Sequence, residues 1–314
     1  MTVFTWLWLI AGFILLIKGA DVFVDASVNI AKRLKIPNVV IGLTIVAIGT
    51  SAPEAVISVS AAIGGSSDMT VGNIVGSNIF NVMFILGLCA LIKPMYVKLK
   101  DIARDYLIGV GAAVLVIAMM IIFTDVIPRF ASGIMLALFA VYIIFVVRQA
   151  LKNRETQATC HGADKPVPLV KNICVALLGV VVIVIGGQLT VTNAVTIALD
   201  LGMTERMVGL TILAVGTALP ELVTSLMACK KGEMDMAIGN IVGSSIFNIL
   251  FILGISGVIL PLAITDNLIF DFAFLVAGSF AFLIFVCTGK KVNRVEGLLL
   301  VAAYIGYMIF ISIG

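Results

Sequence analysis

The sequence predicts an all-α membrane protein of ten transmembrane helices, arranged as two five-helix repeats of inverted topology with proline-broken helices at a central site. Three observations predict this fold class: the composition, the row of apolar segments and a duplicated motif. Of the 314 residues, 61% are apolar and 12% are charged, whereas soluble domains are about 45–50% apolar and about 25% charged. This excludes a water-facing globule. The balance of 20 Lys and Arg against 17 Asp and Glu gives no reason to expect a nucleic-acid partner.

Ten apolar runs follow one another along the chain, and a helix needs about 20 such residues to cross a bilayer. The runs are 3–19, 38–63, 69–92, 106–124, 130–149, 169–188, 207–228, 236–260, 268–287 and 295–313. The first run has no basic segment before it, because the first cation is Lys18. We therefore interpret it as a retained helix and not as a signal peptide.

The cations follow the alternation of sides that ten spans impose on the connections. Eighteen of the 20 Lys and Arg fall on one side, and only Arg129 and Arg206 fall on the other. Because Lys and Arg are enriched in cytoplasmic loops, we expect both termini on the non-cytoplasmic face of a prokaryotic inner or plasma membrane, within its lipid bilayer. The longest polar connection, 151–168, is predicted to be a cytoplasmic linker between the repeats 1–150 and 169–314.

Residues 42–87 and 209–254 align without a gap at an offset of 167 and are identical at 28 of 46 positions. The identities include polar residues, so shared hydrophobicity does not explain them, and a duplication does. Each half holds five spans, an odd number, so the second copy enters the membrane from the opposite side. Inverted repeats are typical of secondary transporters with a central site, although a channel or a receptor can also carry a duplication.

Glu54 and Glu221 occupy equivalent positions in the middle of two spans, whereas we expect the other 15 acidic residues in loops or at span ends. An ionised carboxylate at that depth costs at least roughly 2.5–3.5 kcal/mol, so it needs a partner. Neither span contains Lys, Arg or His. Two interpretations stay open: neutral acids that hold helices together, or carboxylates whose partner is a bound cation.

A proline precedes each glutamate, as Pro53 and Pro220. Proline has no N–H for the carbonyl four residues back, so we expect the helices to open near Gly49 and Gly216. Helical spacing then brings hydroxyls, a carboxylate and loosened carbonyls to one face, from Ala47, Thr50, Ser51 and Glu54. These are hard oxygen donors, which suit Ca²⁺ and Na⁺ better than zinc or copper.

The span after each broken helix carries a polar stripe. In the first repeat Asn73, Ser77 and Asn81 recur every four residues on an otherwise apolar helix. We expect Asn81 and its equivalent Asn248 to bind the ion or to orient a carboxylate. The small residues spaced four apart, Gly72 and Gly76 with Gly239 and Gly243, favour close helix packing.

The segments GTSAPE and GTALPE, each followed by GNIVGS(N/S)IFN, resemble the alpha repeats of the sodium/calcium exchanger family, prokaryotic type, within the cation/calcium exchanger superfamily. The resemblance implies Na⁺/Ca²⁺ antiport by alternating access, with Na⁺ sites around one Ca²⁺ site, no cofactor and no obligate protein partner. It implies Ca²⁺ ligands at Glu54, Glu221 and the carbonyls of Thr50 and Thr217, and Na⁺ ligands at Ala47, Ser51, Ser77, Ala214 and Ser244.

Two positions depart from the fuller pattern of that family. Ala218 stands where the first repeat has Ser51, so one hydroxyl ligand is missing. Asn248 stands where some members, including the potassium-dependent branch, carry aspartate. We therefore expect a site charge near −2 and transport that does not require K⁺.

Other functions remain as alternatives. A proton-coupled cation exchanger would use the same glutamates, and a cation channel would conduct faster than a transporter. HExxH metalloproteases and Ser-His hydrolases need a histidine in the apolar core, and the single histidine, His161, lies in the 151–168 linker. The five cysteines have no CxxC spacing and predict neither a disulfide framework nor a zinc site. We therefore expect a transporter and not an enzyme.

Overall fold

The computed structural model describes residues 3–96, 99–157, 168–203, 212, 214–264, 266–289 and 291–313. Within these residues eight helices are long and apolar enough to cross a membrane, and the bent pair Asn38–Thr50 and Ala52–Ile63 makes a ninth span if it is counted as one. The all-helical, multi-pass prediction is confirmed at this level. The predicted span 207–228 lies partly outside the described residues, so the tenth helix stays a prediction.

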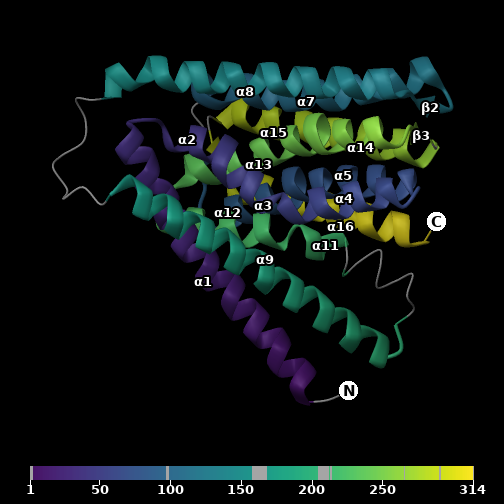
Figure 1. Ribbon diagram of the computed structural model, residues 1–314, viewed down its shortest axis with the longest axis horizontal. Coiled ribbons are helices and arrows are strands. Elements are labelled where there is room, and N and C mark those ends of the chain that lie inside the picture. The colour runs from purple at the N-terminus through teal and green to yellow at the C-terminus, as the bar shows by residue number, and fades with distance from the viewer. Residues whose placement is uncertain are drawn as a thin grey trace.

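Two spans with the same local structure form the centre of the protein (Figure 1). Each is an α-helix that continues through a π-helical segment into a second α-helix. They consist of α5 (Ser67–Ile79), η2 (Phe80–Ile85) and α6 (Leu86–Ile92), and of α13 (Met234–Ile246), η4 (Phe247–Ile252) and α14 (Leu253–Ile259). In their most apolar windows 78% and 83% of the residues are buried, against at most 39% in the other six spans. These spans carry the GNIVGS motifs, so the motifs lie in the core.

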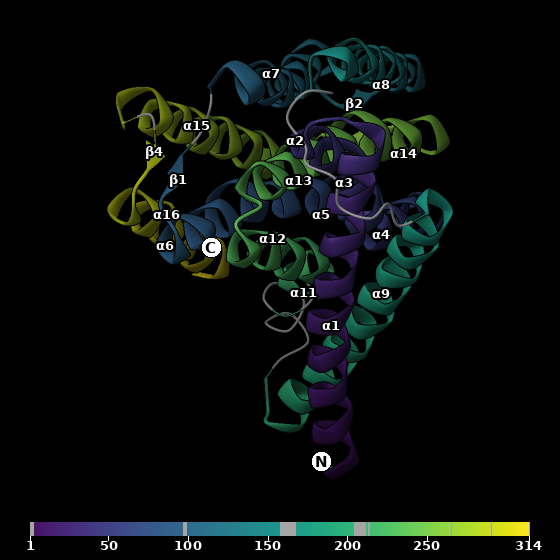
Figure 2. The same ribbon diagram turned by 90° about the vertical axis from the view of Figure 1, so that its left-hand side faces the viewer.

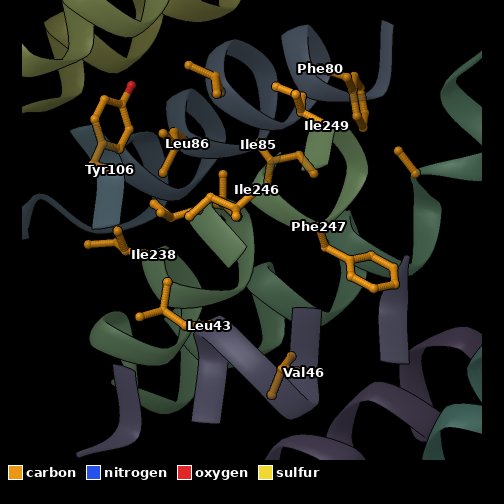
Figure 3. Packing of buried hydrophobic residues seen from close by; sticks show 14 of the residues in the cluster. Leu43, Val46, Phe80, Ile85, Leu86, Tyr106, Ile238, Ile246, Phe247 and Ile249 are labelled. Carbon is orange, nitrogen blue, oxygen red and sulfur yellow. The ribbon is translucent and has the colours of Figure 1, made fainter. Parts of the chain in front are cut away.

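The first broken helix packs against α13. It consists of α2 (Asn38–Ile41), η1 (Gly42–Val46), α3 (Ala47–Thr50) and α4 (Ala52–Ile63). Figure 3 shows Leu43 and Val46 of η1 on one side of Ile246 of α13, and Ile85 of η2 on the other. The burial of this apolar layer holds the broken helix in place.

Small residues allow this close packing in the second repeat, as the spacing predicts. A Cβ at Gly243 would lie 2.6 Å from the Leu43 carbonyl oxygen, and one at Gly239 would lie 2.6 Å from the Val39 carbonyl oxygen. For Gly72 and Gly76 no described atom lies within 4 Å of such a Cβ. The equivalent packing partner in the second repeat, 206–214, lies mostly outside the described residues.

Helices α1 (Val3–Leu34) and α9 (Leu169–Asp200) lie side by side and extend away from the other helices (Figure 2). Each has 32 residues, which at 1.5 Å per residue gives about 48 Å, well beyond a hydrocarbon core of about 30 Å. Their contact is close because glycines face it: a Cβ at Gly12 would lie 2.8 Å from the Thr190 amide nitrogen.

The predicted ends of these two spans, 19 and 188, are therefore wrong by more than ten residues. Hydropathy falls after Ile17, but the helix continues to the turn at Lys35, whose φ is +56°. Asp21 and Asp25 consequently lie inside a helix and not in a loop or at its end. They form ion pairs with Lys231, at 2.7 and 2.6 Å.

The remaining helices are α7 (Leu99–Phe123), α8 (Arg129–Gln157), α11 (Ala214–Thr217), α12 (Leu219–Lys231), α15 (Asp266–Gly289) and α16 (Arg294–Ile313). Helices α7 and α8 form the layer at the top of Figures 1 and 2. Four two-residue strands, which the sequence did not predict, make two antiparallel ladders. They are β1 (Met95–Tyr96) with β4 (Lys291–Val292) and β2 (Val126–Ile127) with β3 (Leu262–Ala263).

Each ladder joins the first half of the chain to the second. Strands β1 and β3 are separated by the same 167 residues as the motifs, from Met95 to Leu262. The helices repeat the pattern, because α6 packs on α16 and α14 packs on α8. The two halves therefore contribute equivalent elements to equivalent contacts and are intertwined.

Candidate functional site

Both glutamates lie in the first turn of a helix that follows a break. Helix α3 ends at Thr50, Ser51 is non-helical, and α4 leaves at an angle of 49° with Pro53 in its first turn. In the second repeat α11 (Ala214–Thr217) and α12 (Leu219–Lys231) are interrupted at Ala218, whose φ and ψ of −90° and 9° resemble the −81° and 8° of Ser51. The interruptions fall two residues after the predicted positions Gly49 and Gly216. Each proline consequently lies in the first turn of the next helix, where its missing N–H costs no helical hydrogen bond.

The two carboxylates are fully buried, with no exposed surface. The Ser51 hydroxyl donates a hydrogen bond of 2.7 Å to Oε1 of Glu221, which connects the break of the first repeat to the glutamate of the second. Oε2 of Glu221 and both oxygens of Glu54 have no hydrogen-bond partner among the described residues. Buried polar atoms are rarely left without a partner in native proteins. This set of acceptors therefore calls for a ligand that offers positive charge or protons.

The glutamates differ because Ala218 replaces a serine. Ser51 supplies the donor for Glu221, whereas Ala218, the repeat equivalent of Ser51, is fully buried and has no hydroxyl group. The sequence indicates a missing hydroxyl at Ala218. In the structure, both carboxylate oxygens of Glu54 lack a partner in the described part of the chain. The site is chemically asymmetric although its backbone is repeated.

The Thr50 hydroxyl at the break has acceptors in both halves. Its oxygen lies 3.1 Å from the Val46 carbonyl oxygen of its own half and 3.2 Å from Oδ1 of Asn240, and Nδ2 of Asn240 donates to the Ser225 hydroxyl at 2.9 Å. In the first repeat Nδ2 of Asn73 donates to Ser58 at the same distance. Asn240 was not among the predicted site residues, although its identity with Asn73 at the repeat offset was the signal that could have found it.

Two residues of the polar stripe in each central span are buried, and their side chains lack partners within the described residues. Ser77, Ser244, Asn81 and Asn248 are at most 2% exposed, and none of their side-chain oxygen or nitrogen atoms has a hydrogen bond there. The two amides lie within the π-helical segments η2 and η4, and π-helical turns are frequent at functional sites.

Asn78 has the same character and was not predicted. It is fully buried, and neither atom of its amide has a partner among the described residues. Comparison of the two repeats does not identify this position, because the equivalent residue is Ser245 and not asparagine. The Ser245 hydroxyl donates to the Ile241 carbonyl of its own helix. Burial in the tertiary structure identifies Asn78, and the sequence does not.

The other predicted ligands lie at the two breaks. Ala47 begins α3 and is fully buried, and Thr217 ends α11 and is 8% exposed. Ala214 begins α11, and its side chain lies outside the described part of the structure.

The donor set is made of carboxylate, hydroxyl and amide groups. No group of three or more His, Cys, Asp or Glu that could hold a metal ion occurs among the described residues. The arrangement therefore suits hard cations that accept neutral oxygen ligands beside one or two carboxylates, and it does not resemble a site for a soft metal.

Comparison with known proteins agrees with this chemistry. The family model described as "Sodium/calcium exchanger protein" matches residues 4–148 and 171–313. The CaxA protein of Alkalimonas amylolytica is 37% identical over 309 residues, which cover 96% of each chain. The sodium/calcium exchanger MaX1 of Methanosarcina acetivorans is 33% identical over 338 residues, again 96% of each chain.

The fold also matches solved structures. A structure of the sodium-calcium exchanger NCX_Mj soaked with Na⁺ and Ca²⁺ superposes with a TM-score of 0.84 at 31% identity and covers 97% of each chain. The family model spans nearly the whole chain, and both curated relatives exceed 30% identity. The chain therefore belongs to the sodium/calcium exchanger family, prokaryotic type, and is a multi-pass membrane transporter and not an enzyme.

Proposed function

We propose that the protein is a Na⁺/Ca²⁺ antiporter, which exchanges the two ions across the membrane by alternating access. The observation that carries this proposal is the pair of fully buried glutamates, three of whose four oxygens lack a partner among the described residues. Carboxylates at membrane depth mark ion pathways. A cation that binds there supplies the partner that the protein does not.

The proposed ligands divide between the two ions. Ca²⁺ binds the carboxylates of Glu54 and Glu221 and the carbonyls of Thr50 and Thr217. Na⁺ binds at flanking positions built from Ala47, Ser51, Ser77, Ala214 and Ser244, and Asn81 and Asn248 bind ions or orient the carboxylates. The ions are the substrates, and the proposal includes no cofactor.

Charge explains why the two ions exclude each other. Two carboxylates give the site a charge near −2, which one Ca²⁺ or two Na⁺ neutralise. Without an ion, the two nearby negative charges repel in a medium of low dielectric constant. A loaded site is therefore able to move between outward-open and inward-open states, and an empty charged site is not, which couples the movement of one ion to that of the other.

The intertwined halves support ten helices in two inverted repeats. Each half pairs a strand with the other half, and the two strands β1 and β3 that do so are separated by the 167-residue offset of the motifs. Inverted repeats provide two equivalent half-sites that meet at the bilayer midplane. We propose repeats at 1–150 and 169–314, joined by a cytoplasmic linker at 151–168, with both termini outside the cytoplasm of a prokaryotic inner or plasma membrane.

A proton-coupled cation exchanger is the second candidate, and the Glu54 carboxylate, whose oxygens have no partner among the described residues, favours it. Protons satisfy such oxygens as well as cations do, and neighbouring acids share protons readily. Such an exchanger would move Ca²⁺ under a pH gradient without Na⁺.

The deciding experiment is ⁴⁵Ca²⁺ uptake into proteoliposomes under an outward Na⁺ gradient, with and without a pH gradient. We expect uptake with the Na⁺ gradient alone and without K⁺.

Glu54→Gln and Glu221→Gln should each abolish this uptake, because an amide cannot neutralise Ca²⁺. Asp68→Asn, which removes an exposed carboxylate in the first turn of α5, is the matched control and should transport normally. Near-normal uptake in either glutamine variant would remove the site, and uptake that follows only the pH gradient would select the second candidate.

A further inference from the structure

The outer pair of helices α7 and α8 carries a groove whose lining is not part of the ion site. The groove has a volume of about 320 Å³. Its lining is mostly apolar: Ile108, Gly111 and Leu115 come from α7, Leu138, Val141 and Phe145 from α8, and Leu250 from η4, and Tyr142 of α8 is the one lining residue with a polar side-chain atom. A mostly apolar groove between two membrane-spanning helices is filled by an alkyl chain more readily than by water.

On each of the two helices, the face that lines the groove carries positively charged residues beyond one end of the groove. On α7 the spacing Arg104, Ile108, Gly111, Leu115 keeps one face of the helix, since residues three or four apart are neighbours. Arg104 is therefore the next residue beyond the groove. Its guanidinium carbon lies 4.4 Å from the centre of the Phe145 ring, which lines the groove.

Helix α8 shows the same continuation at the same end. Val141 and Phe145 line the groove, and Arg148 and Lys152 follow on that face. Both cations are exposed, and neither has an ion-pair partner among the described residues. Arg104 is different, because Asp105 forms an ion pair with it at 2.9 Å. Among the described residues, the unpaired positive charge at this end of the groove therefore comes from Arg148 and Lys152.

An apolar groove with a cationic end is complementary to one kind of molecule in a membrane. We propose that the groove binds an acyl chain of an anionic phospholipid, whose phosphate is held by Arg148 and Lys152. The distribution of Lys and Arg predicts that this end faces the cytoplasm, where anionic headgroups attract basic residues near the membrane surface. The inference does not depend on which ions the protein transports.

Two glycines provide a matched pair of variants. A Cβ at either Gly111 or Gly133 meets no described atom within 4 Å, so both sites accept a side chain. Gly111 lines the groove, and Gly133 lies on α8 away from its lining. Gly111→Leu therefore places an isobutyl group in the groove, and Gly133→Leu adds the same group to the same pair of helices elsewhere.

The test is a lipid titration of the purified, detergent-solubilised protein by native mass spectrometry, with dioleoyl phosphatidylglycerol and dioleoyl phosphatidylcholine as probes. We expect the protein to bind phosphatidylglycerol more tightly. The double variant Arg148→Gln/Lys152→Gln should reduce that preference by about 25-fold, or about fivefold for each cation near a membrane surface. Gly111→Leu should weaken the binding of both lipids, and Gly133→Leu should bind them as the unmodified protein does.

Equal affinity for the two lipids would overturn the anionic assignment, and so would an unchanged preference in the double variant. Unchanged binding by Gly111→Leu would show that the lipid lies elsewhere. A mass that reveals a stable dimer, lost in Gly111→Leu and kept in Gly133→Leu, would assign the groove to a second copy of the chain and refute the proposal.

Discussion

The hydrogen bond between Ser51 and Glu221 is a sensitive point of the proposed ion site. Ser51→Ala removes one oxygen and leaves the backbone of the break unchanged. The bond is 2.7 Å long, and both residues are fully buried. Glu221 would then resemble Glu54, with two partnerless oxygens in the described part of the chain.

The size of the effect follows from the chemistry of that bond. A hydrogen bond to a charged group contributes about 1.5–3 kcal/mol, and each 1.4 kcal/mol corresponds to a factor of about ten in an equilibrium constant. We expect Ser51→Ala to raise the apparent KM for Ca²⁺ by about 10- to 150-fold, because Glu221 is no longer held toward the break. The apparent KM for Na⁺ should rise as well, since Ser51 is also a proposed Na⁺ ligand.

Uptake of ⁴⁵Ca²⁺ into proteoliposomes at varied Ca²⁺ and Na⁺ concentrations measures both constants. Ser279→Ala is the control, because Ser279 is buried and its hydroxyl donates to the Leu275 carbonyl of its own helix. Ala218→Ser tests the same reasoning in reverse by offering Glu54 a donor, and the double variant restores the number of hydroxyls. Unchanged constants for both ions in Ser51→Ala would refute the argument.

Three further predictions concern Asn240, the pH dependence of uptake and the ion pairs of Lys231. Asn240→Ala should raise the apparent KM for Ca²⁺ about tenfold in the same uptake assay, because Thr50 loses its contact across the repeats; Asn193→Ala, which loses a bond to a carbonyl of its own helix, is the control, and equal values for the two variants would contradict the prediction. Lowering the pH from 8 to 6 should weaken Ca²⁺ uptake, because protons and Ca²⁺ compete for the same carboxylates; an apparent affinity that is constant over this range would argue against free carboxylates. Lys231→Gln should lower the melting temperature of the detergent-solubilised protein, because it breaks two ion pairs between α1 and α12 that contribute up to about 1 kcal/mol each; the difference from the unmodified protein should shrink in high salt, and a difference independent of salt would exclude an ionic origin.

Much of the fold is readable from the sequence because its signals are local. Apolar runs identify helices, and eight of the predicted spans match helices that pass the length and hydropathy test in the described residues. The ends of helices are less predictable. Helix α1 extends to Leu34 because the turn at Lys35, and not the fall in hydropathy, ends it.

The short ladders were missed for a related reason. Strands of two residues are too short for an alternating pattern, and β1 finds its partner β4 almost 200 residues away. The pairing depends on how the two halves meet and leaves no signal in either segment alone.

By itself the sequence determined the membrane class, the duplication and the two mid-span glutamates, because composition, periodicity and identity at a fixed offset are properties of the chain. Only the tertiary structure decided how the acids differ. Ser51 and Glu221 are 170 residues apart, and Thr50 and Asn240 are 190 residues apart, so these contacts exist only once the halves have packed together. The repeat makes the two glutamates equivalent in the chain, and the packing gives Glu221 a hydroxyl donor, whereas neither carboxylate oxygen of Glu54 has a partner among the described residues.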